Sequence, residues 1–350
     1  MSFARTMSRL NGYSYINGNY ISMYNKYSCR LTKRAFRAGE EFMPDFPDSI
    51  DLKITNKCEW SCPWCHESSN KNGKSFSLSR TKEILSVLPK VPIEIAIGGG
   101  NVLDIAEDTL DLVLWLKERN NQPRITINYR DVEKYWNEVD GPEYKLVKEV
   151  NHIGVSLSKA PHGITEFSDF YSSSADDGKS FDHKHWKSNF STYVFGSGSY
   201  QTVFHVIAGL FPPKDILELR KNFKNYPILF LGYKQWGRAK DTELPIKTLQ
   251  ETEEIVAELM SSNMYGSYQN SSVLGFDNLA LEQLHIKDKL PERVFERLYL
   301  GDEGSHSMYI DAVNEEYAVT SRSPERVSWN DVGLLDYFKN ISLNGSKCNI

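Results

Sequence analysis

From residue 48 onward, short apolar segments with a period of two alternate along the chain with longer segments of helical period. A period of two indicates a β-strand, and apolar residues three and four apart indicate an amphipathic helix. Strands that alternate with helices predict βαβ units, in which neighbouring strands run parallel in an α/β fold. The predicted strands are Ile50–Ile54, Ile93–Ile97, Ile125–Tyr129, Ile153–Leu157, Val203–Ala208 and Ile228–Leu231, followed by a short one at Val273–Phe276.

Three of the five cysteines lie close together, directly after the first predicted strand. They are Cys58, Cys62 and Cys65, spaced C-x3-C-x2-C. A [4Fe–4S] cluster ligated by protein alone takes four cysteines, so three thiolates leave one iron open to a small molecule. The spacing therefore favours a cluster with an open iron over one that only carries electrons.

Three other uses of these thiols are open. A zinc ion could take the cysteines together with His66, although His66 directly follows Cys65 and cannot easily turn back to the same metal. Disulfides need an oxidising compartment, and three neighbouring cysteines cannot all pair among themselves. Unrelated buried thiols would have no reason to cluster.

The cysteine spacing, with the aromatic Trp64 just before Cys65, resembles the signature of the radical S-adenosylmethionine (radical SAM) superfamily. The resemblance covers residues 48–275 and implies a partial (β/α)6 TIM-like barrel. It implies one [4Fe–4S] cluster on the three cysteines, with SAM chelated to the open iron. Reductive cleavage of SAM would release a 5′-deoxyadenosyl radical, which abstracts hydrogen from substrate. A flavodoxin or ferredoxin is implied as the electron donor.

The same resemblance assigns a SAM contact to the loop after the second predicted strand. Radical SAM enzymes often carry Gly-Gly-Glu-Pro there, whereas this chain has Gly98, Gly99, Gly100 and Asn101. The glycines retain the backbone contact expected for the SAM amino group, and the side-chain contacts of Glu-Pro are missing.

Further SAM contacts are assigned by position along the strands. Asn128 and Ser156 stand where the family places polar residues against the methionine and ribose of SAM. Trp64 matches the aromatic beside the adenine, and Gly232–Arg238 resembles a segment that gives backbone contacts to adenine.

Strand alternation predicts a polar interior for such a barrel. The apolar residues of the first four strands share one parity and should face the helices, so the other parity faces the interior. These interior residues suggest contacts to SAM and a polar substrate, or pairing with one another, such as Lys53 with Glu94. His205 on the fifth strand is either a substrate contact or a structural histidine. The interior set is Asp51, Lys53, Thr55, Glu94, Ala96, Gly98, Thr126, Asn128, Arg130, Gly154, Ser156 and Ser158.

Two segments flank the predicted barrel. Residues 1–47 show no clear periodicity and are expected to be an extension packed on the main domain. Residues 276–350 contain a predicted hairpin, Ser307–Val313 with Tyr317–Val319, which resembles the start of the cysteine-rich extension of peptide-modifying radical SAM enzymes. Cys29 and Cys348 cannot supply a further four-cysteine site, so we expect one cluster only. Residues 160–200 are expected to form an insertion or active-site lid.

Composition excludes some classes of protein. The net charge is -5, which argues against nucleic-acid binding. No apolar stretch of about 18 residues is present, so no transmembrane helix is expected, and the N-terminus lacks a signal-peptide core. Few cysteines and an oxygen-sensitive cluster indicate a reducing cytoplasm.

The substrate is not encoded in any motif. The hairpin resemblance favours a peptide side chain, and a single-cluster core favours a nucleotide or another small metabolite. A non-catalytic iron–sulfur scaffold or sensor would carry the same cysteines.

Overall fold

The computed structural model describes residues 7–9, 12–25, 31–131, 140–150, 152–157, 202–223, 226–243, 246–265, 274–299 and 301–344. Outside these ranges lie Cys29, Ser158, the predicted lid 160–200, Val273 and Cys348.

The core of the fold is a ten-stranded sheet in the order β11-β10-β9-β8-β7-β6-β5-β12-β13-β14. The neighbours from β11 to β12 are all parallel, as the βαβ pattern predicted. The six principal predicted strands and the short seventh are confirmed as β5 (Ser49–Thr55), β6 (Glu94–Gly99), β7 (Gln122–Asn128), β8 (His152–Leu157), β9 (Thr202–Ile207), β10 (Ile228–Leu231) and β11 (Leu274–Phe276).

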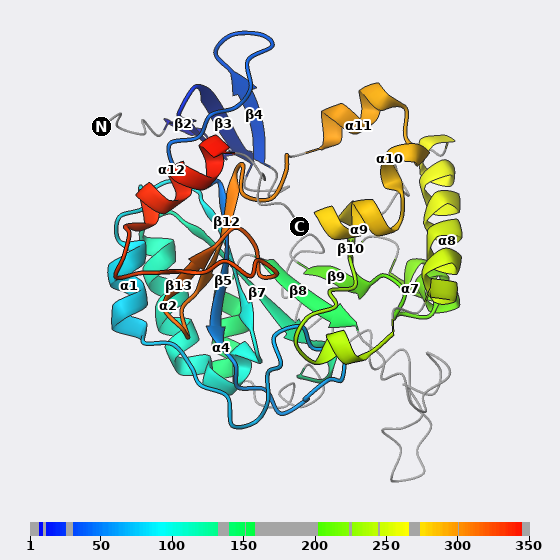
Figure 1. Cartoon of the computed structure of the whole chain (residues 1–350), viewed down its shortest axis with the longest axis horizontal. Helices are drawn as coiled ribbons and strands as arrows, with labels where there is room; N and C mark the ends of the chain where they lie inside the picture. Colours follow the sequence, from blue (N-terminus) through cyan, green and yellow to red (C-terminus); the bar gives the residue numbers. More distant parts are fainter. Residues whose placement is uncertain are drawn as a thin grey trace.

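Helices connect the strands and cover the apolar face of the sheet. Figure 1 shows α1, α2 and α4 beside the first strands of the sheet, and α7 and α8 beside β9 and β10. None of the helices in the described ranges combines the length and apolar character needed to traverse a membrane. The helices are α1 (Leu78–Leu85), η1 (Val102–Ile105), α2 (Ala106–Glu118), α4 (Pro142–Glu149), α7 (Pro213–Asn222), η3 (Gly237–Asp241), α8 (Ile246–Tyr265), α9 (Asn278–Gln283), α10 (Ile286–Lys289), α11 (Glu292–Leu298) and α12 (Leu334–Asn344).

The two faces of the parallel strands differ as their alternation predicted. Ile50, Leu52 and Ile54 of β5 are buried in one apolar core with Ile95 and the other aliphatic residues of the same parity. The opposite parity is mostly only partly buried, as in β6 and β7. Polar side chains therefore line the face of the sheet that points away from the helices.

The region 276–350 joins this sheet directly. The predicted hairpin is confirmed: β12 (Ser307–Asp311) pairs antiparallel with β13 (Glu316–Ala318), and β14 (Val327–Ser328) follows. In addition, β12 pairs in parallel with β5, with Tyr309 opposite Asp51 and Asp311 opposite Lys53. Side chains of β12 thus lie next to the strand that leads into the cysteine loop.

The N-terminal region forms a second sheet that the sequence analysis missed. Its order is β1-β2-β3-β4, and all its pairs are antiparallel. The buried residues include Tyr15, Tyr20 and Tyr24 rather than aliphatic residues. One signal was available, because Asn17-Gly18 between alternating segments is typical of a tight hairpin, and Gly18 has the required positive φ of 57°. The strands are β1 (Met7–Arg9), β2 (Gly12–Asn17), β3 (Tyr20–Asn25) and β4 (Leu31–Ala35).

Buried polar contacts attach this sheet to the start of β5. Asn17 Nδ2 donates to Phe46 O at 2.8 Å and to Asp48 Oδ1 at 3.0 Å. The Tyr20 hydroxyl donates to Asp48 Oδ2 at 2.7 Å, and Lys33 Nζ lies 2.7 Å from the same oxygen. Asp48 immediately precedes β5, so the N-terminal sheet fixes the entry of the strand that carries the cysteine loop.

We predict that Asn17→Ala lowers the free energy of unfolding by about 2–4 kcal/mol, because it leaves several buried polar groups without partners. Urea unfolding followed by circular dichroism measures the effect. The control is Asn72→Ala, whose side chain is exposed. Equal stability of the two variants would contradict the role given to Asn17.

Candidate functional site

The three cysteines lie on the loop between β5 and α1, at the carboxyl end of β5 (residues 56–77). All three are partly buried and free of disulfides. The loop folds back on itself, since Cys58 N donates to Asn70 O at 2.9 Å and Cys65 N donates to Cys62 O at 3.1 Å. Catalytic groups in parallel α/β folds lie at this end of the strands.

The thiols lie close enough to interact electrostatically. Cys58 and Cys65 both raise the pKa of Cys62, because neighbouring thiolates would repel one another. Cys65 raises the pKa of Cys58 for the same reason. The backbone N–H groups of Trp60 and Ser61 lower the pKa of the Cys58 thiol, against the larger rise that its burial causes. Ser61 adopts a positive φ of 43° within this turn. Hydrogen bonds to ligand sulfur are one means by which proteins tune iron–sulfur clusters.

The three cysteine side chains are not gathered around a single point. In the described part of the chain, no group of three or more His, Cys, Asp or Glu side chains converges on one point as a metal ion requires. A zinc ion needs its sulfur ligands about 2.3 Å from one centre. A cubane instead binds each cysteine through a different iron, so its thiolates stand further apart. Three thiolates are the donors that such a cluster takes from the chain when one iron is left open.

Two arginines, Arg130 and Arg238, counteract the effect of burial on the pKa of the Cys62 thiol. Burial raises the pKa of the Cys62 thiol to about 11, and the positive charges of Arg130 and Arg238 act against that rise. Burial also raises the pKa of Cys58. These thiols therefore stay protonated at neutral pH unless a metal supplies positive charge, which deprotonates a coordinating thiol.

The segment after β10 holds the backbone of the cysteine loop. Arg238 donates from Nε to Cys62 O at 3.0 Å, from Nη2 to Ser69 O at 2.8 Å and from its backbone N to Cys65 O at 3.1 Å. Gly237 has a positive φ of 56°, and a Cβ there would lie 2.5 Å from His66 O. In the sequence analysis this segment was assigned to adenine, and its role as a support for the loop was missed.

Trp64 packs against the same segment. It is buried in a small cluster with Tyr233 and Ala239, and Cys62 packs against this cluster. The indole therefore fixes the position of the loop near Cys62. An adenine contact by Trp64 stays a prediction.

The glycine loop after β6 lies against the start of the cysteine loop. Gly100 N donates to Thr55 O at 2.6 Å, and Asn101 N donates to Lys57 O at 2.7 Å. Gly99 has a φ of +111°, and a Cβ there would lie 2.4 Å from Thr55 O. The glycines allow two backbones to meet, which brings the predicted SAM loop next to the predicted cluster loop.

Asp131 is a buried link that the sequence analysis missed. Its Oδ1 accepts hydrogen bonds from Trp60 Nε1 at 2.8 Å and Asn101 Nδ2 at 3.0 Å, and its Oδ2 accepts from Asn128 N at 3.1 Å. It thus ties the cysteine loop, the glycine loop and the end of β7 together. Nothing in the local sequence marks it, because two of its three partners, Trp60 and Asn101, are distant along the chain.

Asn128 and Ser156 lie on the polar face of the sheet, as predicted, and both are partly buried. Asn128 Oδ1 accepts from Arg130 N at 3.0 Å. Ser156 stands in register with His205 on the next strand. These positions place both residues on the face where SAM was predicted, and their contact with SAM stays a prediction.

His205 lies over the gap left by Gly154. A Cβ at Gly154 would be 2.3 Å from Cε1 of the imidazole. Burial lowers the pKa of His205 to about 4, so the ring is neutral at physiological pH. The imidazole thus occupies the polar face beside Ser156, as a substrate contact would require.

The expected pairing of Lys53 with Glu94 is wrong. Lys53 Nζ lies 2.9 Å from Glu67 Oε2 and 3.0 Å from Asp311 Oδ2, whereas Glu94 pairs with Arg124 at 2.8 Å. The reason is that β12 and the cysteine loop bring two carboxylates closer to Lys53 than the neighbouring strand does.

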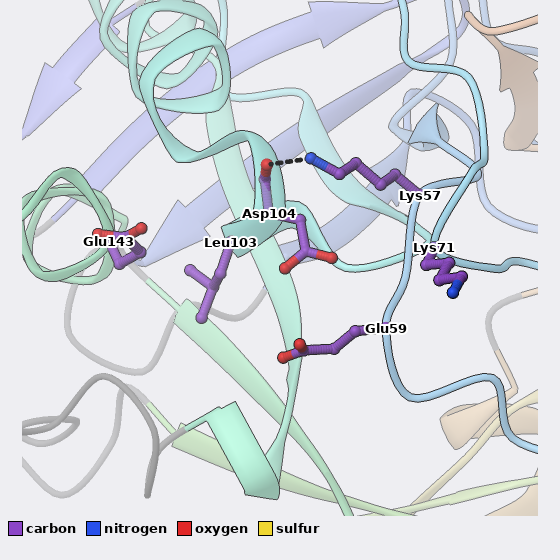
Figure 2. Close-up of a pocket in the computed structure, with 6 residues that line it drawn as sticks. All are labelled: Lys57, Glu59, Lys71, Leu103, Asp104 and Glu143. Carbon is purple, nitrogen blue, oxygen red and sulfur yellow. Dashed lines mark hydrogen bonds between the residues drawn. The ribbon is translucent and has the colours of Figure 1, made fainter.

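A polar cavity of about 340 Å³ borders the cysteine loop. Figure 2 shows Glu59 and Asp104 extending into the same space, and Lys57 Nζ donates to the main-chain oxygen of Asp104 at 3.4 Å. Lys57 and Glu59 flank Cys58, so this cavity gives access to the loop from the side of η1 and α4. It is lined by Lys57, Glu59, Lys71, Leu103, Asp104 and Glu143.

We predict that Gly99→Ala lowers the free energy of unfolding by about 1–3 kcal/mol, because an alanine Cβ would strain the positive φ and meet Thr55 O. Thermal or urea unfolding measures the loss. Gly98→Ala is the matched control, since a Cβ at Gly98 would have no atom of the described residues within 4 Å. A loss of the same size in both variants would argue against close contact between the loops.

A second prediction concerns pH. Burial raises the pKa of Asp131 to about 6, so the folded state holds a proton that the unfolded state releases. The resulting stabilisation is full below about pH 4 and is lost as the pH rises through about 6, a change on the order of 3 kcal/mol.

Asp131→Asn should therefore reduce the difference in unfolding free energy between pH 4.5 and pH 7. Urea titrations at the two pH values test this, with the exposed Asp111→Asn as control. An unchanged difference in the Asp131 variant would show that Asp131 does not titrate in this range.

Comparison with known proteins adds information on the fold. No family model matches the chain, and no curated protein matches its sequence. Among solved structures, Streptococcus suis SuiB bound to the precursor peptide SuiA superposes with a TM-score of 0.57 at 12% identity, over 88% of this chain and 68% of SuiB. SuiB bound to S-adenosylmethionine superposes with a TM-score of 0.54 at 13% identity, over 85% of this chain and 66% of SuiB. The chain thus spans about two thirds of SuiB and shares its fold.

Proposed function

We propose that this protein is a radical SAM enzyme that uses one [4Fe–4S] cluster on Cys58, Cys62 and Cys65. In this proposal residues 48–275 form a partial (β/α)6 barrel, flanked by residues 1–47 and 276–350. The observation that carries the proposal is the C-x3-C-x2-C loop at the carboxyl end of β5, with three mutually interacting thiols. A fold shared with a SAM-bound structure supports it.

The residues have distinct roles in this proposal. The three cysteines hold three irons and leave the fourth for SAM. Gly98, Gly99 and Gly100 offer their backbone to the SAM amino group, Asn128 and Ser156 contact its methionine and ribose, and Trp64 lies beside its adenine. When bound, the cluster and SAM supply reductive C–S cleavage and hydrogen abstraction, while the chain binds, orients and excludes water.

A peptide side chain is the substrate that we favour. The support is that SuiB, which shares the fold, was crystallised with a precursor peptide, and that the hairpin of β12 and β13 is present. The polar face of the sheet offers hydrogen-bonding groups to such a substrate, His205 among them. A small metabolite is the alternative. Electrons would come from a flavodoxin or ferredoxin in a reducing cytoplasm.

We predict that the anaerobically reconstituted protein binds about four irons per chain and forms 5′-deoxyadenosine from SAM with dithionite. Cys62→Ala should lose iron and activity and keep its folded circular dichroism spectrum, because the loop is stabilised independently by Arg238. Iron analysis and chromatography of the nucleoside products measure both effects.

The control is Cys348→Ala, which removes a thiol that the proposal does not use. Four irons in the Cys62 variant would contradict the ligand assignment. If the wild type contained a single zinc ion per chain, the proposed cluster would be wrong and the cysteines would form a zinc site. A cluster that yields no 5′-deoxyadenosine would indicate a scaffold or sensor.

A further inference from the structure

Four polar side chains join the C-terminal hairpin to the cysteine loop, and we call them the clasp: Lys53, Glu67, Tyr309 and Asp311. Lys53 Nζ contacts Glu67 Oε2 at 2.9 Å and Asp311 Oδ2 at 3.0 Å. The Tyr309 hydroxyl donates to Glu67 Oε1 at 3.0 Å. Glu67 lies two residues after Cys65, whereas Tyr309 and Asp311 lie on β12. The clasp thus joins the loop to a strand more than two hundred positions later.

The clasp is nearly inaccessible to solvent. Lys53 is 6% exposed, and Asp311 and Tyr309 are each 4% exposed. Charges held away from water interact strongly, and removal of one partner leaves an uncompensated charge. These contacts therefore differ from surface ion pairs, which contribute little.

The two residues of the clasp that lie on β12 have further contacts within the C-terminal region. Asp311 Oδ1 accepts from Val313 N and Asn314 N at 3.0 Å each, within the turn between β12 and β13. The guanidinium of Arg326 lies 4.9 Å from the centre of the Tyr309 ring. Asp311 is thus held by the turn of the hairpin and Tyr309 by the segment that precedes β14, in addition to their contacts in the clasp.

The loop side of the clasp adjoins the predicted cluster ligands. Ser68 N donates to Cys65 O at 3.2 Å, which closes a turn around His66 and Glu67. His66 Nε2 lies 3.5 Å from Glu67 Oε1. A displacement of the Glu67 carboxylate therefore moves the turn that follows Cys65.

We propose that Tyr309, through Glu67, and Asp311, through Lys53, are positioning residues for the cluster, which set the geometry and charge compensation of the loop after Cys65. This inference rests on the proposed function, since it assumes that the loop binds a cluster. The Lys53 ammonium is shared between the Glu67 and Asp311 carboxylates, and the Tyr309 hydroxyl donates to Glu67, two residues after Cys65. Loss of Lys53 leaves one more uncompensated negative charge beside the loop, and loss of the Tyr309 hydroxyl leaves the Glu67 charge less dispersed. Both changes make reduction of the cluster less favourable.

The experiment is a redox titration of the reconstituted cluster in Tyr309→Phe, followed by electron paramagnetic resonance. We expect the ratio of reduced to oxidised cluster at a fixed potential to fall threefold to tenfold, where tenfold corresponds to about 59 mV for one electron. SAM cleavage should fall with it, while iron content stays that of the wild type.

Tyr317→Phe is the matched control on the same hairpin. The Tyr317 hydroxyl is buried and has no hydrogen-bond partner among the residues that the structure describes, so its removal should leave the potential unchanged. A second pair of variants tests the charge of Lys53 independently of Tyr309. Lys53→Arg keeps the positive charge and should retain most of the wild-type potential. Lys53→Met removes the charge and should lower the potential at least as far as Tyr309→Phe does.

The outcomes separate this inference from the proposed function. A wild type that binds no cluster overturns the proposed function. A wild type with a cluster, and with the same potential in Tyr309→Phe and Tyr317→Phe, overturns the clasp alone. Equal potentials in Lys53→Met and Lys53→Arg also overturn it, because charge compensation would then be irrelevant.

Discussion

The parallel pairing of β5 with β6 on one side and β12 on the other governs the rest of the site. A strand paired on both edges has little freedom at its carboxyl end, because its backbone groups are already engaged. Thr55 O, at that end, accepts from Gly100 N. The cysteine loop therefore leaves the sheet from a fixed point, and the glycine loop is fixed against the same point.

From that point the site is completed by polar contacts rather than by apolar packing alone. Arg238 holds the loop through backbone oxygens, Asp131 links it to the ends of β6 and β7, and Lys53 links it to β12. Such directional contacts suit a loop that must present thiols in one arrangement, since apolar contacts specify position less strictly.

The sequence predicted the parallel strands well because each buries aliphatic residues of a single parity, as in Ile50, Leu52 and Ile54. The N-terminal sheet escaped prediction because its core is built from tyrosines and polar residues, and the Asn17-Gly18 turn was its one strong local signal. The cysteines were found because their spacing is local.

The supports of the site were not predictable in the same way. No local motif distinguishes the polar residues Asp131, Arg238 and Glu67. Their structural roles depend on partners that only the fold brings close to them. The predicted pair of Lys53 with Glu94 failed for this reason: neighbouring strands suggest a partner, but β12 enters from the far end of the chain and provides a closer one.

The hydrogen bond from Arg238 Nε to Cys62 O joins two residues that lie 176 positions apart in the sequence. During synthesis, a chain that has emerged only as far as β10 already contains all three cysteines and lacks the guanidinium that arranges their backbone. Domains generally fold as units once their long-range partners exist. Under the proposed function, cluster assembly is thus expected to follow synthesis of Arg238, because a shorter nascent chain carries the three thiols on a loop that lacks this support.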